Sequence, residues 1–176
     1  MRLLLSLALC ISATVVMADD DDDKDVSTDF KTAATLVGKP TVESGFELLF
    51  GKVDVRLRGI AAPDNDAGEG KNEPGGQASA EHLESLLANV DEVTCFLDGT
   101  LAGDDNGEPV GICVIASGDG AETAVQDLGS LQVAAGHALD CPRYSGGMYK
   151  TQEASAKANG NDLTTVYALP HHCKPR

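Results

Sequence analysis

The chain has 176 residues and is strongly acidic: 13 lysines and arginines face 28 aspartates and glutamates, a formal net charge of −15. This length is enough for one domain with a single hydrophobic core. Phosphate backbones are bound by lysine and arginine side chains that displace counterions, so an acidic surface disfavours nucleic acid as a partner. Four phenylalanines, three tyrosines and no tryptophan also leave little aromatic surface for stacking on bases.

Residues 1–18 predict a cleavable secretory signal. Arg2 supplies a positive charge, an apolar stretch follows as far as Val16, and the segment ends in a small residue, Ala18. The apolar stretch is shorter than the ~20 residues of a membrane-spanning helix. Cys10 offers a weaker alternative as a lipoprotein acylation site, which the bulky Leu9 before it disfavours. We therefore expect a secreted or periplasmic protein with no membrane contact after cleavage.

An acidic leader and one folded domain are expected after the signal. Residues 19–37 begin with six acidic residues between Asp19 and Asp25 and are expected to be a disordered, solvated leader. Residues 38–173 are expected to form the domain, followed by a short tail at residues 174–176.

Three strands are predicted at the start of the domain, over residues 39–42, 46–50 and 52–59. In the third, apolar Val53, Val55 and Leu57 alternate with charged side chains, which is the period of a half-buried strand. Residues 65–76 contain four glycines and Pro74, so a surface loop is expected there. Two more strands are predicted over residues 93–97 and 110–115.

Helical spacing of apolar residues predicts three helices, over residues 77–89, 123–135 and 147–159. The second is expected to stop at Gly136, because glycine suits the left-handed position after a helix. Three strands, a helix, two strands and further helices together indicate a mainly β fold with some α: a five-stranded OB-fold Greek-key barrel with about three packed helices.

Four cysteines follow the signal segment, and an even number in an exported chain implies two disulfides. We favour Cys95 with Cys113, because the two strands that carry them are expected to be antiparallel neighbours. That choice leaves Cys141 with Cys173, which would attach the C-terminal tail to the domain.

A zinc site is the alternative for the later cysteines. His137 and Cys141 are four residues apart, and His171, His172 and Cys173 are adjacent, so the set supplies enough ligands. Export favours oxidation over metal binding, and the histidines are then surface residues.

Residues 55–64, with the sequence VRLRGIAAPD, carry a family resemblance. They resemble the active-site strand of the staphylococcal nuclease (thermonuclease) family, Val-Arg-Leu-x-Gly-Ile-Asp-Thr/Ala-Pro-Glu. In that family the arginine holds the scissile phosphate, the aspartate helps to bind calcium and the glutamate activates water. The resemblance places Arg56 at the arginine, and places Asp64, which is one methylene shorter, at the glutamate.

Further motifs follow in the family's order, so that the resemblance covers residues 38–160. They are GQA at 76–78 followed by Leu83 and Leu87, DNGEPVG at 105–111, and GHA at 136–138 followed by Tyr144, Tyr149 and Glu153. The segment CPRYSGG at 141–147 is similar to a cysteine-containing, exported branch of bacterial thermonuclease-like proteins. The resemblance implies the same OB-type barrel.

The family's metal-binding and charge-stabilising residues are replaced in this chain. The resemblance places Ala61 and Phe46 at two calcium-binding aspartates, Ala62 at a threonine and Glu108 at a second arginine. Calcium takes several oxygen ligands at about 2.3–2.6 Å, and methyl and phenyl groups offer none. A glutamate opposes the charge that the arginine would stabilise, and loss of such stabilisation costs about 10² to 10³ in rate.

Two functions therefore remain open. The first is a catalytically inactive, thermonuclease-like domain without a cofactor, which acts as a binding module for an unidentified partner. In the second, Glu43, Glu47 or Asp64 rebuilds a calcium site for a metal-dependent nuclease or phosphodiesterase, and at least two of these carboxylates converge near Arg56. Without a metal, Asp64 is a turn residue after Pro63, and Arg56 either contacts an anion or pairs with neighbouring carboxylates.

Overall fold

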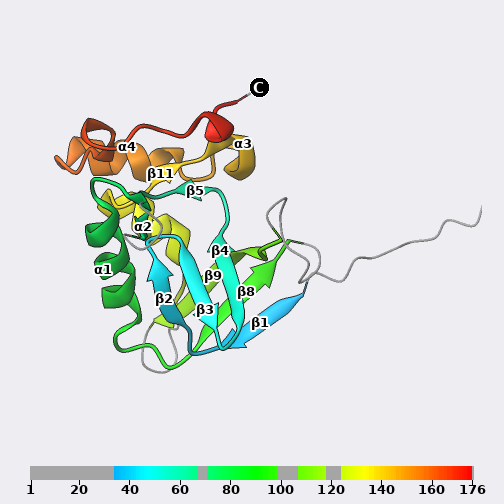
Figure 1. The fold of residues 1–176 in the computed structure, drawn as a ribbon. Helices are drawn as coiled ribbons and strands as arrows, with labels where there is room; N and C mark the ends of the chain where they lie inside the picture. The colour runs from blue at the N-terminus through cyan, green and yellow to red at the C-terminus, as the bar shows by residue number, and fades with distance from the viewer. Residues whose placement is uncertain (1–33, 67–70, 99–106, 118–123, 176) are drawn as a thin grey trace, which may run out of the picture. The chain divides into compact units, whose positions relative to one another are not determined.

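A seven-stranded sheet dominates the computed structural model, which describes residues 34–66, 71–98, 107–117 and 124–175 (Figure 1). The predicted signal segment, residues 1–18, and residues 19–33 of the predicted leader lie outside the described part. Six strands pair in the order β1 (Thr35–Gly38), β8 (Val93–Leu97), β9 (Val110–Ser117), β4 (Val53–Leu57), β3 (Glu47–Phe50) and β2 (Thr41–Ser44). The seventh strand, β10 (Ala124–Asp127), also pairs with β9. The fold is mixed α and β as expected, but its sheet has seven strands rather than five.

The two ends of this strand order are neighbours in the sequence. Only Lys39 and Pro40 separate β1 from β2, and Pro40 has no backbone N–H to continue the ladder. β1 pairs with β8, whereas β2 pairs with β3. The strand predicted over residues 39–42 is thus only one of two strands here. The folded part begins earlier than residue 38, because β1 starts at Thr35, inside the segment expected to be a disordered leader.

Short strand pairs extend beyond the main sheet. The chain leaves β4 and forms β5 (Ile60–Ala61), which pairs with β11 (Leu139–Asp140). The segment expected to be a surface loop is exposed at residues 72–75, but it also contains β6 (Asn65–Asp66) paired with β7 (Lys71–Asn72), which was not predicted. Two hydrogen bonds close this hairpin: the Asp64 N–H donates to Glu73 Oε2 at 2.9 Å, and the Glu73 N–H donates to the Asp64 carbonyl at 2.8 Å.

The helix predicted over residues 123–135 is partly a strand. β10 occupies its first half, where Val125 lies opposite Ala116 of β9, and residue 123 lies outside the described part. Helix α2 (Leu128–Ala135) starts where the Asp127 carboxylate accepts a hydrogen bond from the Gly129 N–H at 2.9 Å, which is an N-cap. The helix ends at Gly136, which has a φ of 80°, so its predicted stop is confirmed.

The other helices flank the sheet and its small strand pairs (Figure 1). Helix α1 (Gly76–Leu87) agrees closely with the predicted helix. Helix α4 (Lys150–Ala158) starts later than predicted, after two glycines with positive φ, and the unpredicted helix α3 (Pro142–Ser145) precedes it. Two 3-10 turns follow, η1 (Leu163–Thr165) and η2 (His171–Cys173). Among the described residues, no helix has the length and apolar character needed to span a bilayer.

The larger hydrophobic cluster lies between the sheet and helices α1 and α2. Leu83 and Leu128 are fully buried in it, as are both cysteines of the first disulfide. Cys95 and Cys113 lie directly opposite each other on β8 and β9 and form that disulfide, which confirms the favoured pairing.

A smaller cluster joins the C-terminal segment to β5 and β11, with Leu139 and Tyr167 among its buried members. The second disulfide, Cys141 to Cys173, lies inside this cluster and connects the start of α3 to η2. Both later cysteines are therefore in a disulfide and are not thiolate ligands, which excludes the zinc set proposed with His137.

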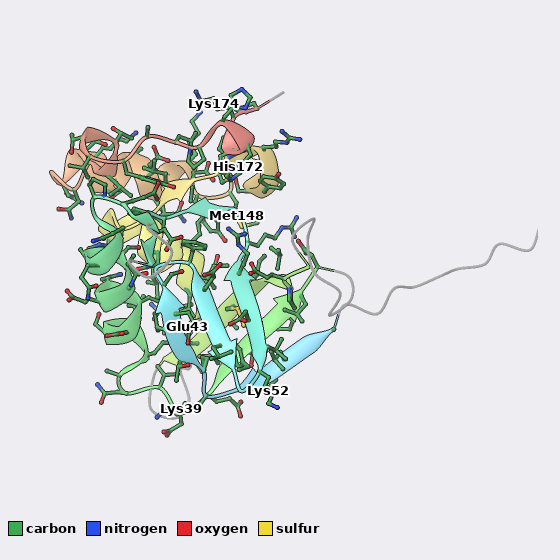
Figure 2. The ribbon with its side chains drawn as sticks, viewed as in Figure 1. Lys39, Glu43, Lys52, Met148, His172 and Lys174 are labelled. Atoms are coloured by element: carbon green, nitrogen blue, oxygen red, sulfur yellow. A yellow bond between two sulfur atoms is a disulfide. The ribbon has the colours of Figure 1, made fainter. Side chains whose placement is uncertain are left out.

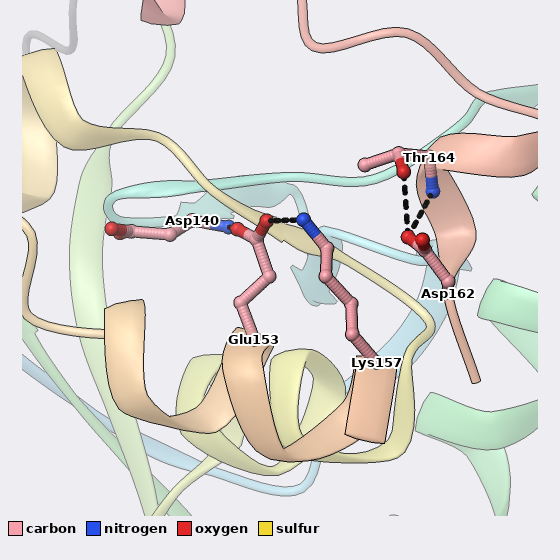
Figure 3. A network of polar contacts seen from close by, with 5 residues as sticks. All are labelled: Asp140, Glu153, Lys157, Asp162 and Thr164. Atoms are coloured by element: carbon pink, nitrogen blue, oxygen red, sulfur yellow. Dashed lines mark hydrogen bonds and ion pairs between the residues drawn. The ribbon is translucent and has the colours of Figure 1, made fainter. Parts of the chain in front are cut away.

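Polar contacts attach α4 to its neighbours (Figure 3). Glu153 Oε1 accepts a hydrogen bond from Lys157 Nζ at 2.7 Å, and its Oε2 accepts one from the Asp140 N–H at 2.9 Å. Asp162 caps η1, where its Oδ1 accepts from the Thr164 N–H at 3.1 Å. Glu153, one of the residues that carry the family resemblance, thus links α4 to β11.

Candidate functional site around Arg56

Strand pairing brings two carboxylates to the guanidinium of Arg56. Glu47 on β3 lies directly opposite Arg56 on β4. The parallel pairing of β4 with β9 places Val110 beside Arg56, and the Arg56 N–H donates to the Pro109 carbonyl at 2.8 Å. The turn before β9 therefore holds Glu108 next to the same side chain.

Arg56, Phe46, Glu47 and Glu108 form what we call the Arg56 cluster. Arg56 Nε lies 3.6 Å from Glu47 Oε1, and its Nη1 lies 3.6 Å from Glu108 Oε2. The guanidinium carbon lies 5.1 Å from the centroid of the Phe46 ring, which is within cation–π range. Of the two roles left open for Arg56, the structure shows the pairing with neighbouring carboxylates.

The cluster has two carboxylates for one guanidinium, so its formal net charge is negative. The three ionic side chains are between 25% and 41% exposed. At this exposure each ion pair contributes at most about 1 kcal/mol, because solvent screens the charges. Both distances exceed ordinary hydrogen-bond length, so the attraction is mainly electrostatic. The cluster is therefore weakly held, and its charge does not favour an approaching phosphate.

Glu47 has a raised pKa, and the causes show which groups surround it. Burial is the largest cause, and the attraction of Arg56 opposes it. The negative charges of Glu108 and Asp64 raise the pKa further, whereas the Ser44 hydroxyl, which donates to Glu47 Oε2 at 3.3 Å, lowers it. Three carboxylates thus act on one another next to Arg56, which makes the local potential negative.

Asp64 follows Pro63 at the start of the β6–β7 hairpin, as expected of a turn residue. Its backbone is fixed by the two hydrogen bonds to Glu73. Its charge acts on Glu47, and it also contributes to the raised pKa of Tyr167, which burial chiefly brings to about 12. Asp64 is therefore near enough to affect the Arg56 cluster electrostatically.

The two alanines that the resemblance places at oxygen-bearing positions are buried in hydrophobic clusters. Ala61 is 7% exposed and belongs to the smaller cluster, and Ala62 is 5% exposed and belongs to the larger one. Glu43 lies exposed on β2 (Figure 2). In the described part of the chain, no three histidine, cysteine, aspartate or glutamate side chains are arranged to hold a metal ion.

A buried polar network that the sequence did not predict lies behind the β2–β3 turn. Gln132 of α2 is fully buried, and its amide nitrogen donates to the carbonyls of Gly45 at 2.7 Å and Ser79 at 3.0 Å. Its oxygen contacts His82 Nδ1, and the His82 ring stacks on His137 with centroids 4.4 Å apart. Because Gly45 precedes Phe46, this network positions the turn that carries half of the Arg56 cluster.

Arg58, in the turn just after β4, is paired as well. Its Nη1 lies 2.9 Å from Asp98 Oδ1, with both side chains well exposed. The alternation along β4 had indicated that Arg56 and Arg58 face outward together, but not which carboxylates would meet them. Of the family motif over residues 105–111, Asp105 and Asn106 lie outside the described residues. No protein-family model matches this sequence, and no curated protein matches it either.

Proposed function

We propose that this chain is an exported domain of the thermonuclease-like, OB-fold type that does not hydrolyse phosphodiesters and acts as a binding module. The observation that carries the proposal is the position of Glu108, whose carboxylate lies 3.6 Å from the arginine that would hold the phosphate. A second arginine at this place would attract the substrate and stabilise its transition state. A carboxylate does the opposite, and Glu47 adds a second negative charge.

The strand order supports the barrel in this proposal. If β1 and β2 are taken as the two halves of one bent strand, the six-strand path contains five strands. In that assignment the bent strand has the second strand, β3, and the fourth, β8, as its neighbours, which is the strand order expected of an OB-type fold. The order of sequence motifs, from residue 38 to residue 160, agrees with the same assignment.

The disulfides support export. Disulfides persist in oxidising compartments such as the periplasm or the extracellular medium. Both bonds are buried within hydrophobic clusters, where Cys95, Cys113 and Cys173 are 0% exposed and Cys141 is 2% exposed. The apolar segment at residues 1–18 provides the matching export signal.

The test is a calcium titration by calorimetry combined with a cleavage assay on fluorescent single-stranded DNA. We expect no calcium-dependent cleavage from the wild-type protein. Arg56→Ala is the informative variant, and Arg58→Ala is its matched control, because Arg58 lies just after the end of β4 and both arginines pair with carboxylates. Micromolar calcium affinity with cleavage lost in Arg56→Ala and retained in Arg58→Ala would overturn the proposal.

That last outcome would establish the second candidate, a metal-dependent nuclease or phosphodiesterase with a rebuilt site. The observation in its favour is the convergence of Glu47 and Glu108 on Arg56, with Asp64 close enough to raise the pKa of Glu47. Glu47→Gln then distinguishes the two candidates further. It would abolish calcium binding in a rebuilt site, but in a binding module it would only remove one weak ion pair.

A further inference from the structure

Charge is divided unevenly along this acidic chain. From Cys141 to Arg176 the sequence has five lysines and arginines and two acidic residues, whereas the rest has 8 basic and 26 acidic residues. The C-terminal segment is therefore a locally positive region on a negative molecule. Such asymmetry orients a charged partner during its approach.

Several side chains of this segment are exposed where α3 packs against η2. The Arg143 guanidinium lies over the Tyr144 ring, 5.8 Å from its centroid, and the Tyr144 ring lies 6.4 Å from that of His172. Tyr144 is 50% exposed and Met148 is 54% exposed. We call Arg143, Tyr144, Met148, His172 and Lys174 the α3–η2 patch. Figure 2 shows Met148, His172 and Lys174 at the end of the structure opposite Lys39 and Lys52.

The cations of the patch have no carboxylate partner within the described residues. The ion pairs found there use Arg56, Arg58 and Lys157, and neither Arg143 nor Lys174 is among them. The patch is also pre-formed, because the Cys141–Cys173 disulfide attaches η2 directly to the start of α3. Cations without a carboxylate partner among the described residues, next to an exposed tyrosine and methionine, are suited to a ligand that is both anionic and apolar.

We propose that the α3–η2 patch docks a short acidic segment of a partner protein, with carboxylates on Arg143 and Lys174 and an apolar side chain against Tyr144 and Met148. This proposal rests on the binding role proposed above and adds the chemical class of the partner. Arginine forms bidentate hydrogen bonds with carboxylates. Tyrosine and arginine are enriched at the hot spots of protein interfaces.

The acidity of the remaining chain favours a short segment over a long polyanion. A nucleic acid strand that extended past the patch would meet the acidic part of the molecule and be repelled. A short peptide contacts the patch alone. Its apolar side chains also use Tyr144 and Met148, which a phosphate backbone would leave without a partner.

The test is fluorescence anisotropy with a labelled peptide of the repeat Glu-Glu-Leu, using the full mature chain with its disulfides intact. We expect saturable binding that weakens as salt rises from about 0.1 M to about 1 M, where the Debye length falls from ~10 to ~3 Å. A peptide with serine in place of leucine should bind more weakly. The double variant Arg143→Glu/Lys174→Glu should weaken binding by about tenfold or more.

Lys39→Glu/Lys52→Glu is the matched control, because it makes the same charge change at the opposite, exposed end of the molecule. This control tests the effect of net charge alone and should weaken peptide binding less than threefold. Far-ultraviolet circular dichroism checks that both double variants are folded. Tyr144→Ala should weaken binding of the leucine peptide more than that of the serine peptide.

Three results would overturn the proposal. The first is an equal loss of peptide affinity in the two double variants. The second is tighter binding of a single-stranded oligonucleotide than of a peptide with equal charge. The third is self-association of the chain, measured by sedimentation, that is abolished in Arg143→Glu/Lys174→Glu. The last result would make a second copy of the chain the occupant. None of these results depends on the cleavage assay, so this proposal and the absence of hydrolysis stand or fall separately.

Discussion

Replacing Gln132 with leucine tests whether the buried polar network holds the β2–β3 turn in place. Leucine has a similar volume, so the change removes hydrogen bonds without a large cavity. The Gln132 amide nitrogen donates to the Gly45 and Ser79 carbonyls, so its oxygen faces His82, and His82 Nδ1 carries the shared hydrogen. Gln132→Leu therefore leaves the Gly45 carbonyl and the His82 N–H without their partner.

The expected loss of stability follows from these two groups. A polar group left buried without a partner costs about 1 to 3 kcal/mol. Gly45 is buried, whereas His82 is only partly buried, so its share is the smaller one. We expect Gln132→Leu to lower the free energy of unfolding by about 3 kcal/mol in total. For a domain of this size that corresponds to a fall in Tm of roughly 10 °C.

Far-ultraviolet circular dichroism during guanidinium and thermal unfolding is the suitable assay, because the chain has no tryptophan. Gln152→Leu is the matched control. The Gln152 amide nitrogen donates only to Ser130 Oγ, at 3.2 Å, and its buried oxygen has no partner within the described residues. It should change stability by less than about 1 kcal/mol. Equal midpoints for Gln132→Leu and Gln152→Leu would refute the reasoning.

Three further predictions concern acid, the second disulfide and the buried alanine. Burial and the neighbouring His82 lower the pKa of His137 from 6.5. At acid pH the unfolded chain therefore binds more protons than the folded chain. The stability that depends on neutral His137 is complete above pH 6.5 and is lost as the pH falls through the pKa of the folded state. His137→Gln should reduce this decline in urea titrations between about pH 7 and pH 5, and an unchanged slope would contradict the assignment. Cys141→Ala/Cys173→Ala opens a loop of 32 residues and should cost about 3 to 4 kcal/mol in thermal unfolding, whereas a cost below about 1 kcal/mol would mean that η2 packs without the bond. Ala61→Asp puts a carboxylate into the smaller cluster and should cost about 3 kcal/mol or more; a stable variant that binds calcium in calorimetry would show that residue 61 faces the Arg56 cluster instead.

Local patterns predicted the elements whose stability is local. The apolar spacing of α1 and the alternation along β4 define faces that must be buried, so their positions follow from the chain itself. The pairing of Cys95 with Cys113 followed from the expected antiparallel neighbours. By contrast, β10 lies in a segment whose apolar spacing fitted a helix, and its pairing with β9, a contact that the local pattern does not contain, makes it a strand.

The candidate site was only partly predictable for the same reason. Arg56 stood out through its motif and its outward position on a strand. That Glu108 would lie beside it depends on the parallel pairing of β4 with β9, a contact between segments far apart in the sequence. Gln132 carried no signal, because a single polar residue in an apolar helix is indistinguishable from one that faces solvent until its partners are known.

The partner of β1 has a consequence for how the protein forms. Thr35 in β1 lies opposite Phe96 in β8, so the first strand of the sheet has no neighbour until much of the chain is available. A nascent chain that ended before Val93 would expose an unpaired apolar edge and would be prone to aggregation. The pairing of β1 should therefore form only after β8 has been synthesised, so the first strand of the sheet is among the later ones to find its neighbour.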